Sequence, residues 1–223
     1  LRNRGVTVET PEVGRWIVQP GLIKAVDIQI EPDLSNAAPF LAAAVVTGGS
    51  VTISGWPQET TQVGNDLLDI LPLFGASVSQ VEDNVTVTGH LDKSGKPVIN
   101  GFTLDLTTGG ELAPAIVAIA ALASSPSTIT GIGHIRHHET DRLAALANEI
   151  NNLGGKVTEL EDGLHIEPAA LHGGLWHSYE DHRMATAGAI IGLRYPIEVE
   201  NIATTSKTMP EFPKLWQQML ESK

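Results

Sequence analysis

The sequence predicts an α/β (α+β) domain made of three βαβαββ repeats, with buried Ala-rich helices and sheets that face outward. One observation is a pattern of an acidic residue, an Ala-rich stretch and a short β-branched strand, which begins at Asp33, Glu111 and Asp181. A second is the further helical stretch that follows each of these strands. The third is composition, since 42% of the 223 residues are hydrophobic and only 18% are charged, as in globular proteins with a large core.

The first repeat is expected to start with a helix from Asp33 through Ala44, followed by a strand at 51–55. A second helix over 65–74 ends at Gly75, because glycine readily adopts the left-handed conformation that closes a helix. Two strands, 75–78 and 85–87, then form a hairpin around a turn at 82–84.

The second and third repeats follow the same order. The second has helices over 111–122 and 141–153, and strands at 103–106, 128–131, 154–157 and 164–166. The third has helices over 181–192 and 212–220 and a strand at 197–201. We expect both helices of each repeat to be buried, because they are rich in alanine and other apolar residues. Residues 1–8 read as a helix end that runs into a strand, so the chain is expected to start inside a repeat.

Composition argues against several classes of protein. The net charge of -12 disfavours nucleic-acid binding, and the longest apolar runs, 37–46 and 113–123, are about half the length of a membrane span. The chain contains no cysteine, which excludes disulfides and thiolate metal sites within it. It opens on Leu1 with no signal peptide, so we expect a cytoplasmic piece of a longer protein, with no nucleic-acid or membrane partner.

Charged residues gather at the starts of two predicted helices. The run His138-Glu139-Thr140-Asp141-Arg142 precedes one helix, and Asp181-His182-Arg183 opens another. Charged and polar residues at a helix start often do no more than cap the helix. We expect this capping role alone for Asp33, the acidic residue that begins the first repeat. Arg142 and Arg183, however, oppose the helix dipole, and guanidinium groups bind carboxylates and phosphates in a bidentate manner. With Lys207, they predict a site for an anionic substrate.

The second acidic residue has different neighbours. Glu111 follows Gly109 and Gly110, and we expect these glycines to let the backbone approach a ligand closely.

These segments resemble the C-terminal half of the 5-enolpyruvylshikimate-3-phosphate synthase (EPSP synthase) family. The motifs are His138-Glu139-Thr140-Asp141-Arg142-Leu143, Asp181-His182-Arg183-Met184-Ala185 and Thr205-Ser206-Lys207-Thr208, together with Gly110-Glu111-Leu112 and the segment 31–37. The resemblance implies an enolpyruvyl transferase-like fold with an active site between two domains. Residues 1–28 would be the tail of the preceding N-terminal domain repeat and a hinge strand, and residues 29–223 the C-terminal enolpyruvyl transferase domain.

The resemblance also implies a reaction. The enolpyruvyl group of phosphoenolpyruvate is transferred to the 5-hydroxyl of shikimate 3-phosphate, phosphate is released, and no metal or organic cofactor takes part. Glu111 would contact the shikimate hydroxyls and accept a proton, and Glu139 would protonate the phosphoenolpyruvate methylene. His138 would contact the shikimate phosphate, and His182 would orient its neighbours. Arg142, Arg183 and Lys207 would hold the carboxylate and phosphate of phosphoenolpyruvate.

Protonation of a carbon needs an acid that is still protonated near neutral pH. Crowding among like charges raises a carboxyl pKa, so we expect a raised pKa for Glu139.

The family's N-terminal half, with its other substrate contacts, is absent from this sequence, so the chain alone is expected to be inactive. Two alternatives stay open: half of a UDP-N-acetylglucosamine enolpyruvyl transferase, and a non-catalytic anion-binding or scaffold domain.

Overall fold

The structure is a computed structural model that describes residues 1–222. The chain divides into two compact units, Leu1–Glu31 and Pro32–Lys223. The first unit contains a short 3-10 turn at Arg2–Arg4 and an antiparallel pair of strands, β1 (Val8–Glu12) and β2 (Arg15–Val18). This order agrees with the helix end and strand predicted at the start of the chain.

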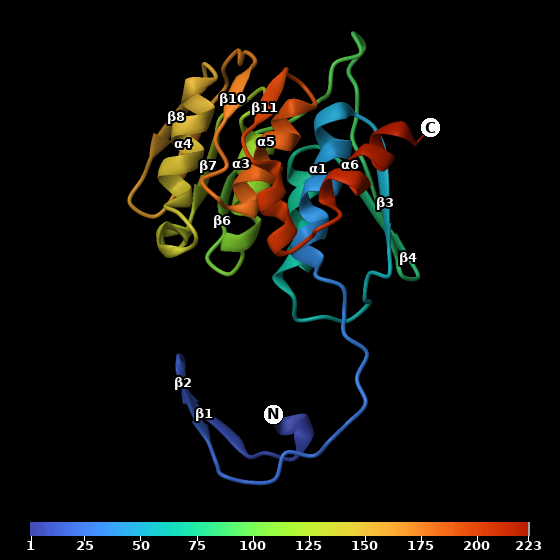
Figure 1. Ribbon diagram of the computed structural model, residues 1–223, viewed down its shortest axis with the longest axis vertical. Coiled ribbons are helices and arrows are strands. Elements are labelled where there is room, and N and C mark those ends of the chain that lie inside the picture. The colour runs from blue at the N-terminus through green and yellow to red at the C-terminus, as the bar shows by residue number, and fades with distance from the viewer. Residues whose placement is uncertain (223) are drawn as a thin grey trace. The chain divides into compact units, whose positions relative to one another are not determined.

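The second unit contains the three predicted repeats (Figure 1). Its helices are α1 (Ala38–Thr47), α2 (Leu67–Leu73), α3 (Ala113–Ala120), α4 (Arg142–Asn152), α5 (His182–Gly192) and α6 (Phe212–Glu221). Its strands are β3 (Ser50–Ser54), β4 (Ser77–Val81), β5 (Asn84–Thr88), β6 (Thr103–Asp105), β7 (Ser127–Thr130), β8 (Lys156–Glu159), β9 (Leu164–Glu167), β10 (Gly174–Trp176) and β11 (Ile197–Val199).

The middle repeat is complete in the order β6-α3-β7-α4-β8-β9, whereas its neighbours have fewer strands. Its strand β7 lies between β6, to which it is parallel, and β9, to which it is antiparallel. The equivalent strands β3 and β11 each pair on one side only within the described residues, with β5 and β10 respectively. The predicted fold class is confirmed, with one full repeat and two partial ones.

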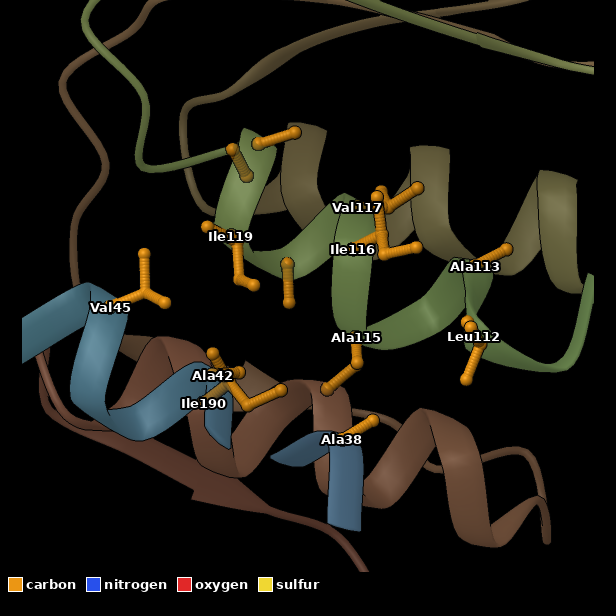
Figure 2. Packing of buried hydrophobic residues seen from close by; sticks show 14 of the residues in the cluster. Ala38, Ala42, Val45, Leu112, Ala113, Ala115, Ile116, Val117, Ile119 and Ile190 are labelled. Atoms are coloured by element: carbon orange, nitrogen blue, oxygen red, sulfur yellow. The ribbon is translucent and has the colours of Figure 1, made fainter. Parts of the chain in front are cut away.

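The first helices of the three repeats form the centre of the core. Helices α1, α3 and α5 pack against one another, and every residue of α3 is buried (Figure 1). Figure 2 shows Ala38 and Ala42 of α1 and Ile190 of α5 directed toward α3. The short alanine side chains let these helix axes approach closely, so three helices with few polar residues can pack together away from water.

The expectation that both helices of each repeat are buried is wrong for the second helix. Helix α4 buries one face and exposes residues such as Asn148, and α6 buries only Phe212 among its described residues. These helices lie outside the three-helix centre, so an amphipathic pattern is sufficient for them.

Within residues 1–222 no helix is both long and apolar enough to cross a bilayer.

Candidate active site

Asp181 joins the start of α5 to the start of α4. Its side chain is fully buried and caps α5 by accepting hydrogen bonds from the backbone N–H groups of Arg183, at 2.8 Å, and Met184, at 3.4 Å. It also accepts two hydrogen bonds from Arg142, at 2.7 Å from Nε to Oδ2 and 3.2 Å from Nη2 to Oδ1. A capping residue of the third repeat therefore fixes a guanidinium of the second.

Arg142 is the first residue of α4, and its side chain is only 2% exposed. Besides Asp181, Nη2 donates to Glu139 Oε2 at 2.8 Å, and Nη1 lies 3.0 Å from His138 Nδ1. Each guanidinium nitrogen thus has a partner within the chain. The sequence predicted a substrate contact for Arg142; these four contacts use four of the five guanidinium N–H donors, which leaves one N–H on Nη1 for an anion.

Glu139 lies between two cations. It is bonded to Arg142 and, through Oε1, to the ammonium group of Lys207, which follows 68 residues later on the 3-10 turn Ile202–Lys207. The hydrogen bond from Lys207 lowers the pKa of Glu139 to about 2, and the charge of Arg142 acts in the same direction. The expected rise in this pKa is wrong for this conformation, because cations rather than carboxylates surround the group.

A second cluster lies around Arg183, the second residue of α5. Its Nη2 donates to Ser35 Oγ at 2.9 Å and to Glu111 Oε2 at 3.2 Å. The Arg183 side chain is 13% exposed, whereas that of Glu111 is 54% exposed. Burial lowers the pKa of Arg183, and the charge of Glu111 opposes this change. Residues from all three repeats therefore meet at this guanidinium.

Gly110 has a structural role that the sequence did not reveal. A Cβ at this position would collide with the ring of His134 and the side chain of Ile135. We expected the glycines before Glu111 to make room for a ligand, but the space beside Gly110 is filled by protein. Glycine is required here because two parts of the second repeat approach closely.

Two histidines border the clusters. Burial and the charge of Arg142 lower the pKa of His138, whose Nδ1 accepts from that arginine, so His138 is neutral near pH 7. His182 is almost completely buried, and neither ring nitrogen has a hydrogen-bond partner within residues 1–222. Burial and the charge of Arg183 lower its pKa as well. A cavity of about 20 Å³ is lined in part by His182, Glu111, Arg183 and Thr205. It has room for about one water molecule.

The structure brings all the predicted site residues into these two clusters, which meet at residues 181–183. Glu139, Arg142, Lys207 and His138 form the first, and Glu111 and Arg183 the second. Neither Ser35 nor Asp181 was predicted as a site residue, although Asp181 belongs to one of the charged groups that the sequence singled out. Among the described residues, no three His, Asp or Glu side chains are arranged to hold a metal ion.

Solved structures place this fold among the enolpyruvyl transferases. An EPSP synthase from Acinetobacter baumannii matches with a TM-score of 0.79 and 25% identity, over 98% of this chain and 53% of that chain. The enolpyruvyl transferase NikO from Streptomyces tendae matches with a TM-score of 0.72 and 19% identity, over 98% of this chain and 51% of that chain. The fold and the clustered charged residues therefore define an enolpyruvyl transferase-like protein.

Sequence comparison identifies the family within this class. The profile of EPSP synthase (3-phosphoshikimate 1-carboxyvinyltransferase) matches residues 1–216. The chain is 56% identical over 223 residues to a 3-phosphoshikimate 1-carboxyvinyltransferase from Kocuria rhizophila, covering 100% of this chain and 49% of that protein. The chain belongs to the EPSP synthase family, and it spans about half the length of the relatives it matches.

Proposed function

We propose that the chain is the C-terminal half of a transferase of the shikimate pathway, which supplies aromatic amino acids. The enzyme moves the enolpyruvyl group of phosphoenolpyruvate to the 5-hydroxyl of shikimate 3-phosphate. The observation that carries this proposal is the convergence of Glu139, Arg142 and Lys207 beside the Arg183–Glu111 pair. Carboxylates for proton transfer then lie next to cations that fit an anionic substrate.

The residues divide the reaction between them. Glu139 donates a proton to the methylene carbon of phosphoenolpyruvate, while Glu111 accepts the proton of the attacking hydroxyl. The new C–O bond gives a tetrahedral intermediate, which loses phosphate while the carboxylate of Glu139 takes back a methyl proton, and the alkene is restored. Lys207 and Arg183 hold the carboxylate and phosphate of phosphoenolpyruvate, and His138 contacts the shikimate phosphate as a neutral donor. Arg142 also binds phosphoenolpyruvate and fixes Glu139.

The low pKa of Glu139 adds a requirement to this scheme. Near neutral pH Glu139 is ionised while Lys207 bonds to it, so it must gain a proton before it can act as an acid. An anionic substrate that draws Lys207 away from Glu139 removes the main stabilisation of the carboxylate. The negative charge of that substrate then raises the pKa of Glu139 further. Substrate binding would thus convert Glu139 from an ion-pair partner into a proton donor.

The domain assignment belongs to the same proposal. Residues 1–28 form the tail of the N-terminal domain and a hinge strand, and residues 29–223 the C-terminal domain. Support comes from the compact unit Leu1–Glu31, in which several large apolar side chains are exposed, such as Val13, Trp16 and Leu22. The N-terminal half would be the partner of this chain. The cytoplasm is the proposed location.

The test is reconstitution from two halves. Phosphate release from phosphoenolpyruvate and shikimate 3-phosphate is measured with this chain alone, and after mixing with the N-terminal half of the Kocuria rhizophila relative. We expect turnover only in the mixture, and its complete loss with Glu139→Gln. The matched control is Glu167→Gln, an exposed carboxylate on β9, which should leave the rate unchanged. Absence of phosphate release from halves that are shown to associate would contradict the proposal.

Replacing shikimate 3-phosphate by UDP-N-acetylglucosamine in the same mixture tests the first alternative. Turnover with UDP-N-acetylglucosamine, and none with shikimate 3-phosphate, would assign the chain to the reaction of the nucleotide sugar. Loss of phosphoenolpyruvate binding in Arg183→Ala would argue against a scaffold role.

A further inference from the structure

Glu149 is a buried carboxylate outside both clusters. It lies on α4, is 1% exposed, and has no role in the scheme above. Its oxygens accept from the backbone N–H of His177 at 2.9 Å and from the hydroxyl of Tyr179 at 2.7 Å, and they lie 3.2 Å from His177 Nδ1. A buried carboxylate is costly unless it is hydrogen-bonded, and all these contacts are made with one short segment, residues 177–179.

That segment forms the turn between β10 and α5, and its backbone is strained. Tyr179 and Glu180 have φ angles of +54° and +55°, which place two consecutive non-glycine residues in the left-handed region. Such a conformation persists only where surrounding contacts enforce it. The turn ends at Asp181, the residue that caps α5 and holds Arg142.

Helix α4 holds this turn at two points. Arg142 and Glu149 are seven residues apart, which is close to two helical turns, so both side chains lie on the same face of α4. Arg142 binds the end of the turn through Asp181, and Glu149 binds its beginning through His177 and Tyr179. The buried charges of this face thus fix both ends of the segment from His177 to Asp181.

We propose that Glu149 is a positioning residue of the active site. By fixing the turn at 177–181, it sets the position of Asp181 and, through it, the guanidinium of Arg142 beside Glu139. Glu149 touches no reacting atom in this account. The link to catalysis rests on the function proposed above, whereas the link to Arg142 is a property of the chain itself.

The experiment measures hydrogen exchange by NMR in the full chain. The probes are Arg142 Nε–H and the backbone amides of Arg183 and Met184, all bonded to Asp181, with the amide of Ile129 on β7 as a core reference. In Glu149→Gln, which keeps the size of the side chain, we expect exchange at the three Asp181-bonded groups to accelerate about tenfold relative to Ile129. Tyr179→Phe, which removes one of the bonds, should give a smaller change in the same direction.

The control is Asn148→Ala, the adjacent exposed position on α4, for which exchange at Arg142 should be unchanged. A purely structural role for Glu149 would accelerate all the probes equally, including Ile129, and would overturn the proposal. Unchanged exchange at Arg142 in both folded variants would overturn it as well. Phosphate release by the unmodified chain mixed with the N-terminal half tests the proposed function separately. Absence of turnover in that mixture would contradict the proposed function, while the exchange rates would still decide the role of Glu149.

Discussion

Asp33 and Asp181 occupy equivalent places in the first and third repeats, yet they have different roles. Each caps a helical turn through its carboxylate. Asp33 is exposed, and within residues 1–222 its carboxylate accepts hydrogen bonds from Ser35 and Asn36 beside it, whereas Asp181 is fully buried and accepts from Arg142 of another repeat. Capping alone therefore does not identify a functional position; a partner from a different repeat does.

The largest expected effect is the loss of unfolding free energy when the charge of Asp181 is removed but its capping ability is kept. Asparagine caps a helix about as well as aspartate, so Asp33→Asn should change the free energy of unfolding by less than about 0.5 kcal/mol. Asp181→Asn leaves the buried charge of Arg142 poorly compensated and should cost about 3 kcal/mol. Urea unfolding of both variants measures the difference. Equal costs at the two positions would remove the distinction drawn between them.

The second repeat differs from both, because Glu111 does not cap a helix and follows Gly110. Gly110→Ala forces a methyl group against the His134 ring and should cost about 2 kcal/mol. Thermal unfolding measures this cost. A control needs a glycine without a positive φ, which rules out Gly95. Gly21→Ala, where the added methyl meets no atom within 4 Å, is the matched control. A neutral Gly110→Ala would show that the ring moves aside freely.

Asp33→Ala removes the cap of the first repeat and the acceptor of the Ser35 hydroxyl, which itself accepts from Arg183. Loss of the hydrogen bonds that Ser35 donates to Asp33 should cost about 1 kcal/mol of unfolding free energy, measured in urea. Phosphate release by the mixed halves should be preserved at a temperature where the variant is folded. A strong loss of that activity with normal stability would give Asp33 a functional role after all.

The smallest effect concerns the pH dependence of the Glu139–Lys207 pair. The pKa of Glu139 is about 2, below its ordinary value of 4.5, so its ionised form stabilises the folded state. This contribution is complete above pH 4.5 and is lost as the pH falls toward 2. Lys207 is half exposed, so Lys207→Met should cost only about 0.5–1 kcal/mol at pH 7. Carbon-detected NMR of the Glu139 carboxyl should show its pKa rising in this variant; an unchanged pKa would contradict the assigned cause.

The repeats were predictable because each carries its own local signal. Acidic residues precede the Ala-rich helices, and Gly75 and Gly154 follow the second helices with positive φ angles. The pairing of Arg142 with Asp181 was not predictable, because these residues are 39 positions apart. The sequence also leaves open whether Asp181, like Asp33, serves only as a helix cap. The low pKa of Glu139 was missed for the same reason, since its cause, Lys207, lies 68 residues away.

The strands β3 and β11 have a consequence for the handling of the chain. Each lacks, within the described residues, one of the two neighbouring strands that β7 has, so one edge of each strand is not paired with another strand. Exposed strand edges are templates on which other chains can add. The net charge of -12 keeps chains apart at low ionic strength, and salt screens that repulsion. Colloidal stability of the isolated chain should therefore be greatest in dilute buffer and should decline as salt is added.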